Sequence, residues 1–273
     1  MKDIYYLRQM NYKFNLRKRR EVSCMFNFAF DKKTIIIILA IILGTWLITT
    51  GTGEILNLFL TIPGVLIALT FHEFAHAFVA NKLGDETPKV QGRLNLNPLS
   101  HIDPVGFIFL IVAKFGWGKP VQIDPRNFNG KYSISKAEAI VSAAGPIMNF
   151  ILAFVFLILY YILFRVTDVI SALSYQWQQV IFLIMTYTIS INIGLGVFNL
   201  IPLPPLDGSK ILMHFLPYKG KEWFYRNQQI FYIVFLILFV TGLSSVILTP
   251  IFSGVLTGME WLVYNIFKLL TLI

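Results

Sequence analysis

The chain has 273 residues, of which 56% are hydrophobic, 15% aromatic and only 14% charged, with a mean hydropathy of +0.67. Soluble domains carry about 25% charged residues, so this composition excludes a soluble globular enzyme, and it is too apolar for a disordered chain. The single cysteine, Cys24, excludes an intrachain disulfide and a zinc site built from cysteines.

Six stretches are apolar enough to cross a membrane, since a span needs about 20 apolar residues. A seventh apolar run, 105–113, has nine residues, so we expect a re-entrant or interfacial segment there. Residues 89–96 alternate apolar and polar side chains, which predicts a short strand. The expected fold is an all-α integral membrane protein of about six transmembrane helices, with a small strand/re-entrant element between the second and third spans. In chain order the predicted spans are 34–50, 55–80, 137–164, 178–201, 230–248 and 250–270.

The basic residues predict a topology. If the N-terminus is cytoplasmic, the inside segments 1–33, 81–136 and 208–229 hold 9, 8 and 4 of the 23 Lys and Arg residues. Lys268 also falls inside and Arg165 alone falls outside, so both termini are expected to be cytoplasmic. The net charge of +9 is then explained by topology and by contact with anionic lipid, and no nucleic-acid partner is expected.

The second predicted span contains the pattern H-E-x-x-H, formed by His72, Glu73 and His76. On a helix the two histidines lie one turn apart on one face and can share a metal ion, while Glu73 can act as a base toward a metal-bound water. The alternative is a chance match. Ionisable residues inside an apolar span are costly, however, which favours a functional metal site.

A catalytic zinc site needs a third protein ligand and an open position. Asp207 is the best acidic candidate, because it follows a proline-rich segment, 202–205, that ends the fourth predicted span on the same side of the membrane as His76. An ordinary loop aspartate before a glycine turn explains the same residue, so both interpretations stay open. The chain has two further histidines, His101 and His214.

These motifs together resemble the site-2 proteases, which are zinc intramembrane metalloproteases, in a short form without a PDZ or other regulatory domain. The resemblance runs from about residue 60 to 210 and includes a stretch typical of a bacterial and archaeal branch. The matching segments are His72–His76, Gly92–Pro104, Gly116–Val121, Ala144–Asn149 and Asn199–Gly208.

The resemblance implies one Zn²⁺ ion per chain, with His72, His76 and Asp207 as ligands and Glu73 as the catalytic acid/base. It also implies candidates for contact with the substrate or the transition state, which are Asn199, Asn149 and His101. A histidine bonded to its own loop is an equally good account of His101. The predicted strand, 89–96, either pairs with an unwound substrate or only packs beneath the re-entrant segment.

The implied substrate is a single-span membrane protein, such as an anti-sigma factor, and the implied location is a bacterial or archaeal plasma membrane. The expected organisation is a basic cytoplasmic N-terminal segment, 1–33, followed by a single polytopic membrane protease domain, 34–273. The competing hypothesis is a non-proteolytic zinc-binding membrane protein, either a transporter or a scaffold. A transporter is expected to show repeated halves with matching broken helices, and none is visible in the sequence.

Overall fold

The computed structural model describes residues 51–107 and 116–270. The first predicted span, 34–50, and most of the predicted re-entrant segment, 105–113, lie outside these residues. The chain divides into two compact units, Met1–Thr50 and Gly51–Ile273, and only the second is described here.

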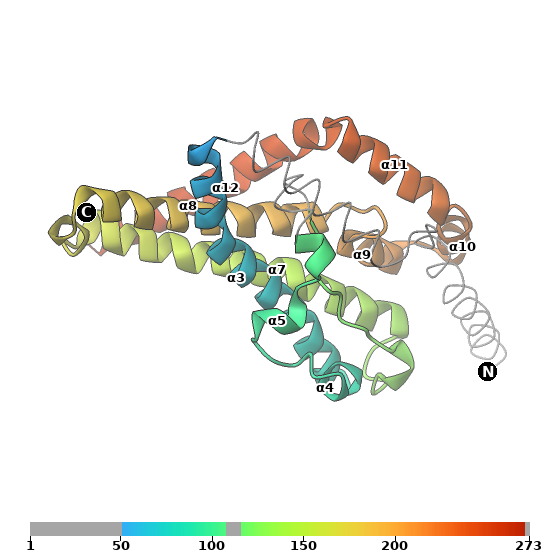
Figure 1. Cartoon of the computed structure of the whole chain (residues 1–273). Coiled ribbons are helices and arrows are strands. Elements are labelled where there is room, and N and C mark those ends of the chain that lie inside the picture. Colours follow the sequence, from blue (N-terminus) through green and yellow to red (C-terminus); the bar gives the residue numbers. More distant parts are fainter. Residues whose placement is uncertain (1–50, 108–115, 271–273) are drawn as a thin grey trace. The chain divides into compact units, whose positions relative to one another are not determined.

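The described part of the chain is helical (Figure 1). It contains one isolated antiparallel bridge, between Ile102 and Gly118, and no strand. The longer helices are α3 (Thr52–Lys82), α7 (Ile134–Tyr161), α8 (Tyr175–Asn199), α9 (Asp207–Phe215), α10 (Tyr218–Arg226), α11 (Gln228–Val240) and α12 (Leu243–Leu269). The short elements are α4 (Thr87–Val90), α5 (Pro98–His101), the 3-10 turns η1 (Pro125–Asn127) and η3 (Ile170–Ala172), and the π-helical turn η2 (Ile162–Val166).

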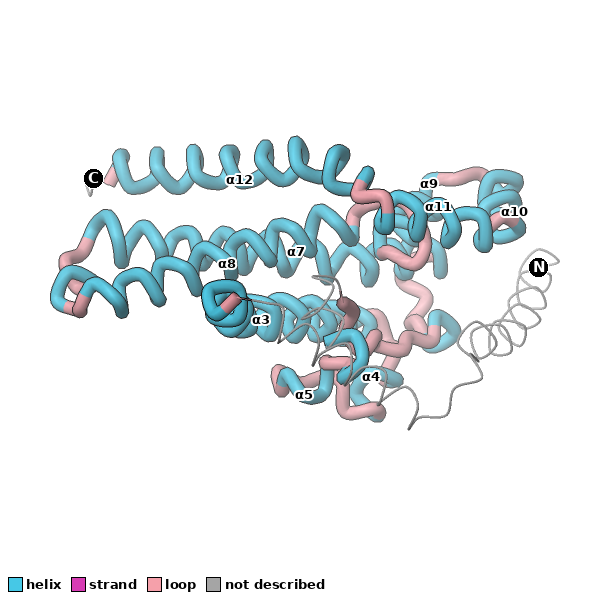
Figure 2. The backbone as a smooth tube through the Cα atoms, turned by 45° about the horizontal axis from the view of Figure 1, so that its top comes forward, coloured by secondary structure: helices cyan, strands magenta, loops and turns pink. Residues whose placement is uncertain are grey.

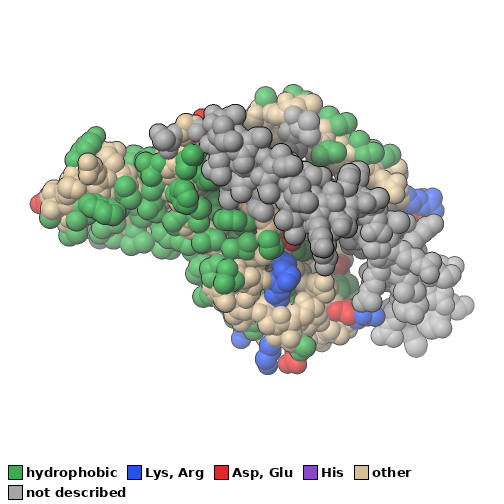
Figure 3. Space-filling view, viewed as in Figure 1, with side chains coloured by type: hydrophobic (Ala, Val, Ile, Leu, Met, Phe, Trp, Pro, Cys, Tyr) green, Lys and Arg blue, Asp and Glu red, His purple; other side chains and the backbone are tan. Residues whose placement is uncertain are grey.

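Four of the described helices, α3, α7, α8 and α12, are long and apolar enough to cross a membrane. The first three confirm the predicted spans 55–80, 137–164 and 178–201. Their apolar composition leaves large hydrophobic side chains exposed along the bundle, and Figure 3 shows this hydrophobic surface extending over α7 and α8. An exposed apolar surface of this extent suits lipid, so the chain is an integral membrane protein.

The last two predicted spans have different boundaries in the structure. Helix α11 has only 13 residues, and the chain then turns at Gly242, whose φ of +73° lies in the left-handed region that favours glycine. Helix α12 begins directly afterwards and runs through Pro250. At 1.5 Å per residue, α11 is about 20 Å long, which is shorter than the hydrocarbon core of a bilayer. Helix α12 thus continues across the boundary expected between 230–248 and 250–270, and α11 by itself is shorter than the other candidate spans.

Helices α3, α7 and α8 pack against one another and form the core of the bundle. Helix α12 joins it through Val263 and Phe267, which are buried beside α7 and α8. The stacked rings of Phe267 and Tyr161, with centroids 5.7 Å apart, bring the carboxyl ends of α12 and α7 together (Figure 2).

At the opposite end of α7, Lys221 of α10 donates to the Ser135 hydroxyl at 3.1 Å. Lys268 at the end of α12 therefore lies at the other end of the bundle from α10. This differs from the topology expected from the charge count, which placed Lys268 and the segment 208–229 on one side.

The predicted strand over 89–96 is wrong. Pro88 lies in the first positions of the single helical turn α4, and Gly92 follows with a left-handed φ of +66°. The side chains of Asn95 and Asn97 then accept hydrogen bonds from backbone N–H groups two residues ahead, which makes successive turns. Val90 is 84% exposed, so the alternating pattern buries no apolar face.

Candidate metal centre

Three side chains from two helices converge on one point. His72 and His76 lie one turn apart on α3, and Asp207 is the first residue of α9. The Nε2 atoms of the two histidines are 3.0 Å apart, and each lies 3.2 Å from Asp207 Oδ2. All three residues are largely buried, so an ion at this point would be well separated from solvent.

The outer nitrogens of both histidines are held by the neighbouring helix. His72 Nδ1 lies 2.6 Å from Oδ1, the side-chain amide oxygen of Asn149. His76 Nδ1 lies 2.7 Å from the backbone carbonyl oxygen of Val141. A carbonyl oxygen can only accept, so each Nδ1 carries the proton and each Nε2 lone pair is free. Metal-ligating histidines are commonly oriented in this way, so the donor set fits a zinc ion.

The third donor carries a negative charge. Its oxygen Oδ2 lies at equal distances from the Nε2 atoms of His72 and His76, and an aspartate carboxylate is ionised at neutral pH. Two neutral imidazoles and one carboxylate form a common ligand set for catalytic zinc.

The chain returns to the two histidines after α8 because the helix cannot continue. The segment 202–205 contains three prolines, and Leu206 is buried just before α9 begins. Gly208 passes so close to this segment that a Cβ atom would lie 2.2 Å from the Leu200 carbonyl oxygen. The turn after α8 thus brings the Asp207 carboxylate beside His72 and His76.

Helix α7 approaches the metal centre closely at Gly145. A Cβ atom there would lie 2.5 Å from His76 Nε2 and 2.7 Å from His72 Nε2, closer than real Cβ contacts allow. The absence of a side chain thus leaves room for the metal-binding face of α3.

A buried amide chain supports His72 from two helices. The Asn149 amide donates to the Ala68 carbonyl at 3.1 Å and to Asn192 Oδ1 at 3.0 Å, and Asn192 in turn donates to the Thr188 carbonyl at 2.8 Å. Asn149 and Asn192 are fully buried. Asn149, expected to contact the substrate or the transition state, thus orients a histidine here.

Asn192 is a supporting residue that the sequence analysis missed. An asparagine in the middle of an apolar span was the available signal, because a buried amide needs partners.

Glu73 points toward the loop between α3 and α7. Its Oε2 atom accepts a hydrogen bond from the Val121 backbone N–H at 2.9 Å. A Cβ atom at Gly118 would lie 3.7 Å from Glu73 Oε1, so the same extended segment borders both carboxylate oxygens. The sequence predicted the role of Glu73 but gave no sign of a backbone partner.

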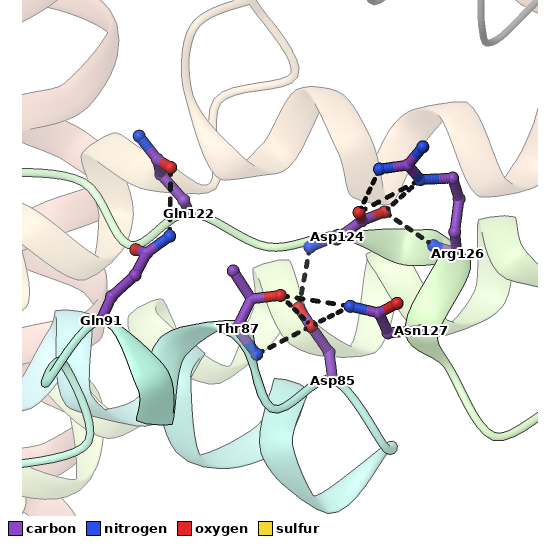
Figure 4. Close-up of polar contacts among 7 residues, drawn as sticks. All are labelled: Asp85, Thr87, Gln91, Gln122, Asp124, Arg126 and Asn127. Carbon is purple, nitrogen blue, oxygen red and sulfur yellow. Dashed lines mark hydrogen bonds and ion pairs between the residues drawn. The ribbon is translucent and has the colours of Figure 1, made fainter.

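The segment that holds Glu73 is itself attached to the protein on both sides of Val121. Lys119 N–H donates to the His101 carbonyl at 2.7 Å, and Asp124 N–H donates to Asp85 Oδ2 at 2.8 Å. Asp85 is fully buried, and its other oxygen accepts from Thr87 and Asn127 (Figure 4). A buried carboxylate with four donors thus holds this loop against the end of α3.

The remaining histidines and Asn199 have partners other than His72, His76 and Asp207. His101 is fully buried, and its Nε2 donates to the Asn95 carbonyl at 2.8 Å, which agrees with a histidine bonded to its own loop. Asn199 donates to the Leu195 carbonyl within its own helix at 3.0 Å. His214 lies on α9, where its ring contacts Phe215. Among the described residues, no hydrogen bond joins these three side chains to the metal centre.

Comparison with known proteins gives a consistent result. The family model of peptidase family M50 matches residues 60–242. A Bacillus subtilis (strain 168) protein named "Putative zinc metalloprotease YwhC" is 40% identical over 191 residues, which cover 70% of this chain and 84% of that protein. A Mycolicibacterium smegmatis protein named "Putative zinc metalloprotease Rip2" is 32% identical over 192 residues, covering 68% of each chain. No solved structure matches the chain.

Proposed function

Because the chain belongs to peptidase family M50, the site-2 protease family, we propose that His72, His76 and Asp207 bind the zinc ion of this intramembrane metalloprotease and that Glu73 is its acid/base catalyst. The observation that carries the assignment is the convergence of three buried donor atoms within 3.2 Å, with both outer histidine nitrogens already bonded. Zinc is the cofactor of the family, and this donor set suits it.

Bound zinc would supply Lewis-acid chemistry, lowering the pKa of a water molecule and polarising a carbonyl oxygen. Glu73 follows His72 directly on α3, one residue from a proposed ligand. It would accept the proton of the attacking water and donate it to the nitrogen of the departing amine. The Val121 N–H holds one carboxylate oxygen of Glu73, leaving the other to accept that proton.

Membrane proteins are the substrates that the family implies. We infer more specifically a protein with a single transmembrane segment, such as an anti-sigma factor, cleaved in a bacterial or archaeal plasma membrane. Support comes from the position of His72, Glu73 and His76 within a helix that is long and apolar enough to span a bilayer. A soluble substrate would not reach this site as readily as a segment that already lies in the membrane.

The end of the bundle that carries 83–107, 116–133 and α10 is proposed to face the cytoplasm, since most basic residues of the described chain are found there. The metal centre lies nearer this end, because His76 is six residues before Lys82, or about 9 Å along the helix. Water would reach the site from this side.

The test of the function is Glu73→Gln in the purified full chain. We expect zinc content to be unchanged and cleavage of a single-span substrate to fall by about 10²–10⁴-fold, because the metal ligands remain and the proton acceptor is lost. Glu54→Gln, on the same helix but exposed at its first turn, is the matched control and should keep full activity. Full activity of Glu73→Gln would remove the protease mechanism proposed here.

A further inference from the structure

A cavity of about 80 Å³ lies between α3, α8 and the loop that follows α5. The side chains that line it are aliphatic or aromatic, and the one polar group among them is the indole N–H of Trp117. The walls used in the argument below are Val65, Ala68 and Leu69 of α3, Trp117 of the loop, and Ile191 and Leu195 of α8.

The α3 wall lies one helical turn from the catalytic residues. Ala68 is four residues before His72, and Leu69 is four residues before Glu73. The two residues of each pair therefore lie on the same face of the helix, about 6 Å apart along its axis. The cavity therefore lies on the side of the metal centre toward the amino end of α3.

Two adjacent residues of the loop after α5 border the cavity and Glu73, respectively. Trp117 lines the cavity, and a Cβ atom at the next residue, Gly118, would lie 3.7 Å from both Glu73 Oε1 and Leu69 Cδ2. The apolar space and the catalytic carboxylate are thus separated by little more than one side chain.

Its chemistry limits what the cavity can hold. A polar side chain would find few hydrogen-bond partners along aliphatic and aromatic walls and would lose free energy on entering. An apolar cavity of about 150 Å³ holds a benzene molecule, so a cavity of about 80 Å³ suits a smaller aliphatic group and excludes an indole.

We infer that this cavity is a specificity pocket, which receives one aliphatic side chain of the substrate next to the scissile bond. The inference rests on the proposed function, because it assumes that the peptide is cleaved at Glu73. Seating that side chain would fix the register of an unwound segment and present one peptide bond to the catalytic residues.

The test uses the purified full chain and a single-span substrate whose cleavage position has been mapped by mass spectrometry. Each residue flanking the scissile bond is changed in turn to Ala, Val, Leu, Phe or Trp, and kcat/KM is measured. At one flanking position we expect kcat/KM to be at least about tenfold higher with Val or Leu than with Trp. Apolar pockets discriminate by about this factor even between side chains that differ by one methylene group.

A size exchange then assigns that preference to the cavity. Ile191→Ala enlarges the α8 wall, and it should raise cleavage of the Phe substrate relative to the Leu substrate by about tenfold, with zinc content unchanged. Ile184→Ala is the matched control, since Ile184 is half-buried, lies two turns earlier on the same face of α8, and does not line the cavity. Leu195→Ala is a second enlarging variant, used if Ile191→Ala fails to fold.

Two results would overturn the pocket. One is a wild-type enzyme that cleaves Trp and Leu substrates equally at every flanking position. The other is an enlarged variant whose size preference equals that of wild type and Ile184→Ala. Failure of the protease function itself would look different, because Glu73→Gln would then cleave the same substrates as fast as wild type.

Discussion

Gly145 shows how a single backbone position of α7 controls the metal centre. The two imidazoles it faces cannot retreat easily, because Asn149 and the Val141 carbonyl already hold their outer nitrogens. Any Cβ atom at Gly145 would come within 2.7 Å of both Nε2 atoms, at the place proposed for the zinc ion. The positions of the two Nε2 atoms therefore depend on residue 145 having no side chain.

Gly145→Ala is expected to weaken zinc binding by about 100-fold, the upper range seen when support around metal ligands is lost. Bound zinc per chain after dialysis against a chelator is the measurement. Gly194→Ala is the matched control, because a Cβ atom there has nothing within 4 Å, and it should retain zinc and gain about 0.5–1 kcal/mol of stability. Normal zinc content in Gly145→Ala would show that α7 does not press on the ligands as described.

Spacing along the chain predicted residues that act together within one helix. It missed residues that meet only when distant segments pack against one another. His72 and His76 are one turn apart in any helix, so the sequence predicts their shared face. The contact of Val121 N–H with Glu73, across 48 residues, leaves no mark in composition, because every residue except proline has this donor. Asn192 was visible as a polar residue in a span, but its partner Asn149 follows only from packing.

At the scale of elements, the loop between α3 and α7 depends on one buried carboxylate. Asp85 accepts from Thr87, Asn127 and the Asp124 backbone, which links α4 and η1 to the end of α3 (Figure 4). Glu73 is held by the same loop through Val121, so the order of the loop and the position of the Glu73 carboxylate are coupled.

Asp85→Ala should destabilise the protein by about 2–4 kcal/mol, because it leaves several buried donors without an acceptor. For a chain of this size that corresponds to a fall in Tm of roughly 5–15 °C, measured by thermal unfolding in detergent. The matched control is Arg126→Ala, which removes an exposed ion pair with Asp124 in the same loop and should change Tm little. Equal Tm values for the two variants would contradict the central role given to Asp85.

Hydropathy located the long helices well and placed two boundaries wrongly. The run from residue 228 to 269 is apolar almost throughout, so the break between α11 and α12 is marked only by Gly242, while Pro250 gives the stronger sequence signal. A proline inside a membrane helix is tolerated where neighbouring groups satisfy the freed carbonyl. The alternation over 89–96 misled for a similar reason, since turns made by Gly92 and two asparagines reproduce a period of two by chance.

At the scale of the whole molecule, the charge count agrees with two topologies. If α11 crosses the membrane, Lys268 lies with the basic loops; if α11 does not cross, Lys268 joins Arg165 on the opposite side. The segments 1–33, 81–136 and 208–229 hold 21 of the 23 basic residues in either case. One lysine is too little for the positive-inside rule to decide between five and six spans.

Packing favours the topology in which α11 does not cross. Phe267 near the end of α12 stacks on Tyr161 at the end of α7, while α10 is bonded to Ser135 at the start of α7. We therefore expect the C-terminus to be reached from the same side of the membrane as the connection between α7 and α8. This revises the expectation that both termini are cytoplasmic.

Single-cysteine labelling tests this directly, because Cys24 is the one native cysteine and Cys24→Ser removes it. In that background, Ser171→Cys reports the connection between α7 and α8, Lys219→Cys reports α10, and Leu269→Cys reports the end of α12; all three positions are exposed. With an impermeant maleimide on intact cells, Ser171→Cys and Leu269→Cys should label together, and Lys219→Cys only after lysis. Labelling of Leu269→Cys only after lysis, together with Lys219→Cys, would instead mean that α11 crosses and that the six-span topology is right.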